Sequence, residues 1–243
     1  MVAFLLVSAG GECQAQETKD RLTPRALEGW HDRVEKALQA DKAEEAVLEM
    51  DEAVKKFPDN AQLLIIRGSL KFRSGKIAES IVDFDKSIEL SPQSKPFLWQ
   101  RGIALYYAER YQDGLDQFAV HREVNPNDVE NAFWHFLCNV RLKGLEASQK
   151  EVLLAGFDNR VPLMEVQKLI QGKLTPEDLI AVFEKSKASV SGRFYGYLYL
   201  GLYYDALKDK ENSKRWLEKC VEQKTDGYMG DVAKIHLKLM KIR

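Results

Sequence analysis

A pattern that recurs every 34 residues constrains the fold of this chain more than any other feature. Written one above another, the segments 27–60, 61–94 and 95–128 align over their full length without a gap. At matched positions they carry a small residue, a large apolar residue and a closing proline: Gly68 and Gly102; Met50, Phe84 and Phe118; Pro58, Pro92 and Pro126. Because proline cannot continue a helix, each segment is predicted to form one separate helical hairpin.

The matched positions also indicate how such hairpins pack. A glycine in the first helix allows the second helix to approach closely, and small residues do the same from the second helix: Ala46, Ser80 and Gly114. Large first-helix residues help to fill the space between the helices: Trp30, Leu64 and Leu98. The alternative is a set of unrelated helical hairpins, but three copies in register favour a true repeat.

The period and the pattern resemble the tetratricopeptide repeat (TPR) family. The resemblance implies an all-α fold, in which helix-turn-helix units form a right-handed α/α superhelix. It predicts five regions along the chain: a signal peptide at 1–15, a linker at 16–26, three tandem TPR units at 27–128, a diverged helical segment at 129–192, and a C-terminal TPR unit with a capping helix at 193–243.

The pattern decays after the third unit. Val129–Leu145 has the periodicity of another first helix, but Phe136 stands where the small residue should be. Its expected partner helix is Ala147–Gly156. Further on, Thr175 and Asp178 form a pair that resembles a capping box and predicts the start of a helix.

The repeat returns near the C-terminus, in residues 194–223, "FYGYLYLGLYYDALKDKENSKRWLEKCVEQ". Gly201 takes the small position there, and Leu217 and Cys220 take the later core positions. A last amphipathic helix is expected near Asp231–Ile242. It would cover the exposed end of the stack, as terminal units of repeat proteins must.

The layout also resembles a narrower group, the bacterial envelope TPR proteins of the NlpI lipoprotein type. The stretches that carry this resemblance are Leu98–Tyr107, Pro126–Asp128, Gly172–Leu179 and Tyr197–Asp209. The resemblance implies an envelope adaptor that docks cell-wall-remodelling enzymes and a protease, usually as a homodimer. Apolar helices at the two ends of the chain leave end-capping and homodimerisation both open.

The first twenty residues, "MVAFLLVSAGGECQAQETKD", have an apolar run followed by a polar segment. This order is typical of a secretory signal peptide, with cleavage after Ala15, so we expect an exported protein. No Lys or Arg precedes the apolar run, which leaves a plain apolar tail and a cytoplasmic protein as the alternative. A lipid anchor on Cys13 is disfavoured because Glu12 precedes it.

The charge balance bears on the kind of partner. Lys plus Arg is 36 and Asp plus Glu is 37, for a net charge of -1. A nucleic-acid binder normally carries a basic excess or stripe, and the chain has none. No apolar run approaches the roughly 18 residues that span a bilayer. The expected partners are therefore other proteins, with no nucleic acid and no membrane anchor.

First-helix positions line the concave face of TPR stacks, and this resemblance implies a partner-binding groove. The predicted groove residues come from the second and third units: Ile65, Ser69, Phe72 and Arg73; Trp99, Ile103, Tyr106 and Tyr107. Exposed aromatic side chains are typical of interface hot spots. The alternative is that the diverged middle segment buries Trp99 and Tyr106 as core. The Lys and Asn of a chaperone-tail clamp are absent from the matching positions, so that subtype is not expected.

An enzyme is the rival class, and the sequence gives it little support. The four histidines do not pair at a zinc-binding helical spacing; they are His31, His121, His135 and His236. Gly75-Lys76 lacks the preceding spacing of a phosphate loop, and no Gly-x-Ser-x-Gly motif occurs. Cys138 and Cys220 are expected to be buried small side chains, with a bridge between them as the alternative. We predict no catalytic residues, no metal and no cofactor.

Overall fold

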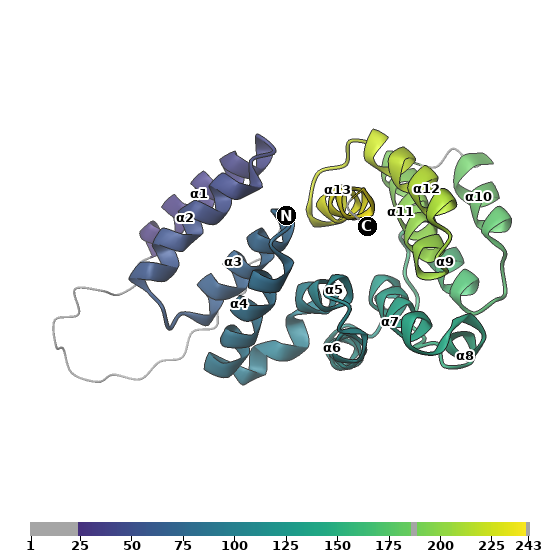
Figure 1. The fold of residues 1–243 in the computed structure, drawn as a ribbon, viewed down its shortest axis with the longest axis horizontal. Coiled ribbons are helices and arrows are strands. Elements are labelled where there is room, and N and C mark those ends of the chain that lie inside the picture. Colours follow the sequence, from purple (N-terminus) through teal and green to yellow (C-terminus); the bar gives the residue numbers. More distant parts are fainter. Residues whose placement is uncertain (1–23, 186–188, 242–243) are drawn as a thin grey trace.

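The structure is a computed structural model that describes residues 24–185 and 189–241. Within these ranges every regular element is a helix and none is a strand. Figure 1 shows successive hairpins side by side along a curved path, with the C-terminal helix inside the curve. The predicted all-α superhelix is confirmed. The predicted signal peptide and nearly all of the predicted linker lie outside the described residues.

The first hairpins match the predicted repeat. The first pairs α1 (Pro24–Gln39) with α2 (Ala43–Lys56), and the second pairs α3 (Ala61–Arg73) with α4 (Ile77–Leu90). Asn60 accepts a hydrogen bond from the backbone N–H of Leu63 at 3.1 Å and thereby caps α3. Such a cap satisfies one of the N–H groups that have no partner within the helix.

The third hairpin begins differently because prolines interrupt it. A 3₁₀ helix, η1 (Pro92–Phe97), precedes α5 (Trp99–Tyr107), and α6 (Tyr111–Val124) completes the pair. Pro96 lies inside η1; it supplies no backbone N–H, so an α-helix cannot run through this position. Helix α5 is consequently short, with aromatic residues at both of its ends.

The turn inside four of the hairpins has the same backbone geometry. The backbone is left-handed at Asp41, Gly75, Glu109 and Lys208, with φ between 50° and 90°. In each case the next residue donates its N–H to the carbonyl five residues back, as Lys76 does to Lys71 at 2.8 Å. This is a Schellman ending. It reverses the chain in the same way in four hairpins, although only one of them has glycine at that position.

The small positions allow the close approach that the sequence predicted. A Cβ added at Gly68 would lie 3.1 Å from the ring of Phe84, and one at Gly102 only 2.6 Å from the ring of Phe118. At Gly201 it would lie 2.5 Å from the side chain of Leu217. The large residue of the second helix therefore packs directly on the glycine of the first, so the two positions depend on each other.

A ladder of arginines joins the first three hairpins. Arg67 donates to Asp83 of its own hairpin at 2.7 Å and to Asp51 of the preceding one at 3.0 Å. One repeat later, Arg101 donates to Asp85 of the preceding hairpin at 2.7 Å and to Gln117 of its own at 3.0 Å. Each arginine thus links neighbouring hairpins.

The middle of the chain departs from the repeat. Helix α7 (Val129–Lys143) begins where predicted and ends two residues earlier, but the expected partner helix at 147–156 is wrong. Helix α8 (Leu145–Lys150) ends after six residues, and a non-helical segment runs to α9 (Leu163–Ile170). Phe136, at the small position, is almost fully buried, and its ring stacks on Tyr203 with centroids 6.3 Å apart. The position that admits the close second helix of a repeat is therefore filled by an aromatic contact with a later part of the chain.

The C-terminal part contains four helices. Helix α10 (Pro176–Lys185) begins at the predicted capping box, since Thr175 and Asp178 exchange hydrogen bonds at 3.0 Å and 3.1 Å. Helices α11 (Val190–Ala206) and α12 (Lys210–Glu222) form the last hairpin. Helix α13 (Tyr228–Met240) was expected at the end of the stack. It lies instead inside the curve, against α12 and α3 (Figure 1).

Candidate partner-binding site on the concave surface

Helix α13 covers part of the predicted groove at its first turns. The ring of Tyr228 stacks on Phe72 with centroids 5.4 Å apart, and it meets the edge of Trp99 at 5.0 Å. Three residues further along α13, Asp231 accepts a hydrogen bond from Arg73 at 2.6 Å. One face of α13 therefore presents an aromatic ring and a carboxylate to the predicted groove residues.

The last turns of α13 contact the other end of the groove through a polar network. Tyr107 and the Nδ1 atom of His236 share a hydrogen bond of 3.0 Å. The Nε2 atom of His236 lies 3.5 Å from Asp205, which also accepts from Arg141 at 2.6 Å and from Tyr106 at 3.3 Å. Burial raises the pKa of Asp205, but His236 and Arg141 outweigh it and hold that pKa below its ordinary value.

All the predicted groove residues lie on α3 or α5. The structure brings Phe72, Arg73 and Trp99 together beneath Tyr228, and Tyr106 lies beside Tyr107 with ring centroids 5.6 Å apart. The remaining groove residues lie near them: Ile103 is buried, and Ile65 and Ser69 are half-buried. Helix α13 covers Phe72 and Trp99 through Tyr228. Tyr106 is only 4% exposed, and Trp134 and Arg141 of α7 contact its ring. The alternative that the diverged middle segment buries groove residues as core therefore holds for Tyr106, whereas Trp99 is half-buried beneath Tyr228.

Two cavities flank α13, one at each end. The first has a volume of about 250 Å³ and lies at the C-terminal turns. Its lining combines Tyr106 and Tyr107 with Arg141, Asp205 and His236.

The second cavity is larger, about 380 Å³, and lies at the N-terminal turn of α13. Trp99 and Ile103 line it, so the predicted groove residues contribute to both cavities.

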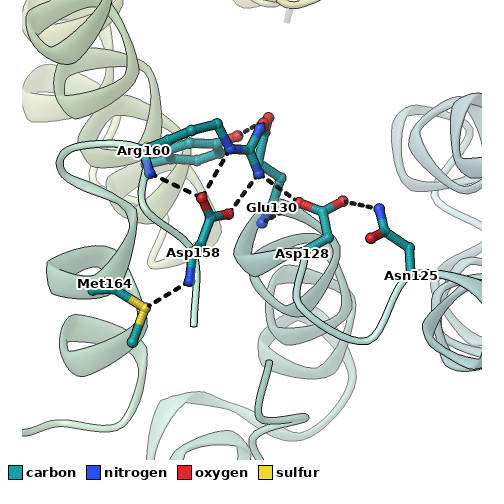
Figure 2. Close-up of polar contacts among 7 residues, drawn as sticks. Asn125, Asp128, Glu130, Asp158, Arg160 and Met164 are labelled. Atoms are coloured by element: carbon teal, nitrogen blue, oxygen red, sulfur yellow. Dashed lines mark hydrogen bonds and ion pairs between the residues drawn. The ribbon is translucent and has the colours of Figure 1, made fainter. Parts of the chain in front are cut away.

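Arg160 lines the second cavity, and Figure 2 shows its polar contacts. It comes from the non-helical segment before α9 and donates to Asp158 at 2.6 Å and to Asp128 at 2.9 Å. It also pairs with Glu130, which accepts a further hydrogen bond from Tyr199. Burial raises the pKa of Glu130 despite these two donors. The network fixes the irregular segment to the first turn of α7.

Sequence reasoning missed several residues of this site, among them Arg141, Asp205 and Tyr228. A signal for the first two was present, because each is a charge that directly follows a long, mainly apolar stretch of its helix. Such charges are rarely buried without a partner, and these two pair with each other. No local signal indicated Tyr228, because its position depends on how α13 folds back.

The histidine and cysteine side chains that an enzymatic role would require take part in the packing of the fold instead. His121 shares a hydrogen bond of 2.7 Å with the carbonyl of Pro96. Burial and the charges of Lys143 and Arg122 lower the pKa of His135 to about 4. Cys138 and Cys220 are buried and unbridged, as expected, and burial raises the pKa of both thiols.

Two further features to consider are a metal-binding cluster and a membrane-spanning helix. Among residues 24–185 and 189–241, no three His, Cys, Asp or Glu side chains gather where a metal ion could be held. In the same part of the chain, no helix combines the length and apolar character needed to cross a bilayer.

Comparison with known sequences identifies the repeat. Residues 61–94 and 196–226 match the tetratricopeptide repeat. These are the second predicted unit and most of the C-terminal one. No curated protein matches the whole sequence significantly. The chain therefore contains tetratricopeptide repeats, at one of the three units that define the period of 34 and at the C-terminal unit.

Solved structures support the same fold. A tetratricopeptide repeat protein from Parabacteroides merdae ATCC 43184 aligns with a TM-score of 0.56 and 21% identity, over 90% of this chain and 86% of that one. MamA from Desulfovibrio magneticus RS-1 aligns with a TM-score of 0.49 and 16% identity, over 81% and 94% of the two chains. The first alignment and the repeat matches together define an all-α TPR superhelix.

Proposed function

We propose that the chain is a non-catalytic protein-interaction scaffold that binds partner segments on its concave surface, beside α13. The observation that carries this proposal is α13 itself. The aromatic and charged residues of α3 and α5 already hold one amphipathic helix, through Tyr228 and Asp231. The surface thus has the chemistry for a peptide segment, and the two cavities at the ends of α13 provide room for one.

General properties of repeat proteins support the proposal. Solenoids form extended concave surfaces that bind other molecules. Aromatic and arginine side chains supply most hot spots in protein interfaces. Trp99 and Tyr106 line the two cavities, and Arg141 lines the smaller one. These residues are the anchors that we assign to partner binding.

The place of action and the partners form the finer part of the proposal. We propose an exported protein of the bacterial envelope, because residues 1–15 have the order of a signal peptide and the layout resembles the NlpI type. That resemblance favours cell-wall-remodelling enzymes or a protease as partners, and a homodimer. The alternatives are a cytoplasmic TPR scaffold and a self-assembling homodimer without a peptide groove.

An affinity capture from the native host tests the binding surface. The baits are the wild-type chain, Trp99→Ala, and the control Leu48→Ala, whose side chain is 63% exposed on α2. Circular dichroism verifies that all three are folded. We expect wild type and Leu48→Ala to capture the same few proteins and Trp99→Ala to lose them. Equal capture by all three baits would contradict the concave site.

A separate experiment tests location. Residues 1–30 are fused to a reporter that is active only after export, beside a fusion that lacks residues 1–15. Activity from the first fusion alone supports an envelope protein. An inactive first fusion supports the cytoplasmic alternative and leaves the concave site unaffected.

A further inference from the structure

Four buried polar atoms without a hydrogen-bond partner belong to residues that line the larger cavity. Within the described part of the chain these are Oδ1 of Asn131, Nε1 of Trp134, Oγ1 of Thr225 and the hydroxyl of Tyr228. Buried polar groups are nearly always paired, so each of the four is unusual. Their residues all border one cavity, which indicates that the cavity accommodates a polar group.

The four residues come from separate parts of the fold. Asn131 and Trp134 are three residues apart on α7 and therefore lie on the same side of it. Thr225 belongs to the connection after α12, and Tyr228 begins α13. Asn131 and Trp134 are 3% and 2% exposed, so water from outside does not reach them freely. The foldback of α13 places Thr225 and Tyr228 in the lining of the same cavity as Asn131 and Trp134.

The orientation of the Asn131 amide determines which hydrogen-bond donors and acceptors these four residues present to a ligand. Its Nδ2 atom donates to the carbonyl of Phe118 at 3.0 Å, which leaves Oδ1 as an acceptor. The indole nitrogen of Trp134 can only donate, whereas the hydroxyls of Thr225 and Tyr228 can do either. A matching ligand group must therefore accept one hydrogen bond and donate another.

A carboxamide has this combination. Its carbonyl accepts from Trp134, and its NH₂ group donates to Asn131 and to a hydroxyl. A carboxylate offers no donor for Oδ1 of Asn131, and Arg160, the cation in the cavity lining, is already paired with Asp128 and Glu130. An ammonium group offers no acceptor and would leave the Trp134 N–H unpaired.

The rest of the cavity suits the stem of such a side chain. Its apolar walls are mainly aromatic: Trp99, Phe118, Phe194 and Tyr195, with Ile103 and Met229. Pockets for small groups combine this kind of lining with a few placed polar groups. A volume of about 380 Å³ accommodates a side chain together with part of its backbone.

We propose that this cavity binds the side-chain carboxamide of a Gln or Asn residue in a partner's peptide segment. This inference rests on the proposed function, since the ligand belongs to a partner protein. Trp134 donates to the amide carbonyl, and Asn131 accepts from the amide nitrogen. Thr225 and Tyr228 complete the polar cluster.

A titration followed by NMR tests the ligand chemistry. The full chain carries ¹⁵N-labelled tryptophan, and the indole signal of Trp134 is assigned with Trp134→Phe. The probes are acetylated, amidated Gly-Xaa-Gly peptides with Xaa as Gln, Asn, Glu, Lys or Met. We expect saturable downfield shifts of the Trp134 signal with Gln or Asn, and at least about tenfold weaker binding of the others. The Trp216 signal, from a residue outside the cavity, should not move.

Two results of this titration would overturn the proposal. One is that no peptide moves the Trp134 signal, which would mean that the cavity contains only solvent. The other is that Lys or Met binds as well as Gln and Asn, which would mean that charge or apolar contact governs the site.

The variants Thr225→Val and Tyr228→Phe test the same cluster without a large change of shape. Removing an unpaired buried hydroxyl should raise the melting temperature of the unliganded protein. The same variants should weaken the Gln peptide by about tenfold. Tyr204→Phe is the control, since Tyr204 lies on α11 outside the cavity and should leave the binding unchanged. A lower melting temperature for both variants would show that the hydroxyls are already paired and would contradict the proposal.

The failure of this inference can be told apart from the failure of the scaffold function. If the host partners are captured equally by wild type and by Thr225→Val/Tyr228→Phe, and no peptide moves Trp134, the carboxamide site is wrong and the scaffold stands. If the Gln peptide binds but no host protein is captured, the site stands and the scaffold function is wrong.

Discussion

Arg67 and Leu200 occupy the same position of the repeat, one residue before the small glycine, in the second hairpin and in the last. Arg67 binds two aspartates and links neighbouring hairpins, whereas Leu200 is fully buried in the apolar core. The first three hairpins thus add ion pairs between neighbours to their packing. At this position the last hairpin relies on apolar packing instead.

The buried residues divide in a similar way. A small cluster is confined to α1–α3, and a larger one extends from α3 to α13. Helix α3 contributes to both, since Leu64 belongs to the small cluster and Phe72 to the large one. The N-terminal hairpin therefore depends mainly on its neighbour, whereas the rest of the chain shares a core that α13 helps to close.

The arginine ladder ends after the third hairpin, within the region that shares the larger core. The next position in its period is His135, which is buried and whose lowered pKa keeps it uncharged near neutrality. A neutral ring cannot replace the two-sided pairing of an arginine. The comparison shows that hairpins of the same repeat can be held together either by ion pairs between neighbours or by apolar packing. The residue that precedes the small position of the first helix helps to decide which of the two applies.

The largest expected effect comes from deleting residues 225–243, which removes α13. Val232 and Ile235 would lose their burial, and Phe72 would lose its cover. Burial of one large apolar side chain is worth roughly 1.5–3 kcal/mol, so we expect a loss of about 4 kcal/mol or more. Denaturant unfolding measures this loss.

Hydrogen exchange on the same deletion localises the effect. Protection should fall in α11 and α12 and remain in α1 and α2. A uniform loss of protection along the chain would show that the two regions unfold as one unit, and the comparison would not hold.

Removal of one ladder arginine should have the next largest effect. Arg67→Ala leaves the buried Asp83 with only Lys71, at 3.0 Å, as a charged partner. Hydrogen bonds to charged groups contribute about 1.5–3 kcal/mol, and we expect a loss in that range. Arg33→Ala is the matched control, because its pair with Glu49 is exposed and worth at most about 1 kcal/mol. Equal losses in urea unfolding would argue against a role for burial in the ladder.

Two glycine substitutions should differ in size. At Gly102 an added methyl group would overlap the Phe118 ring at 2.6 Å, and overpacking of this kind costs about 1–3 kcal/mol. At Gly68 the approach is 3.1 Å, so the gain of roughly 0.5–1 kcal/mol from replacing a helical glycine offsets more of the strain. Gly102→Ala should therefore melt below Gly68→Ala. The reverse order would contradict the packing described for the third hairpin.

The smallest expected effect is the pH dependence contributed by Asp205. Its pKa is lower in the folded protein than its ordinary value, so its stabilising contribution is present at neutral pH. That contribution is lost as the pH falls below the usual carboxyl range, near 4. We expect Asp205→Asn to be less stable than wild type at pH 7 and the difference to shrink towards pH 3. A difference that stays constant in urea unfolding between these pH values would exclude the assigned ion pairs.

The sequence by itself determined the repeated part of this protein. The period of 34, the glycine–phenylalanine pairs and the closing prolines predicted the helical hairpins and the groove-lining helices α3 and α5. They did so because the contacts involved are local, within one hairpin or between neighbours. The capping pair of Thr175 and Asp178 was predictable for the same reason.

Only the tertiary structure decided what lies over the groove. The amphipathic pattern of α13 shows that one face is buried but does not say against which surface. That choice depends on contacts across more than a hundred residues, such as those of Arg73 with Asp231 and of Tyr107 with His236. The polar cluster of Asn131, Trp134, Thr225 and Tyr228 likewise exists only because α13 folds back. No local pattern records such a cluster, since Asn131 and Trp134 of α7 lie about ninety residues before Thr225 and Tyr228 in the sequence.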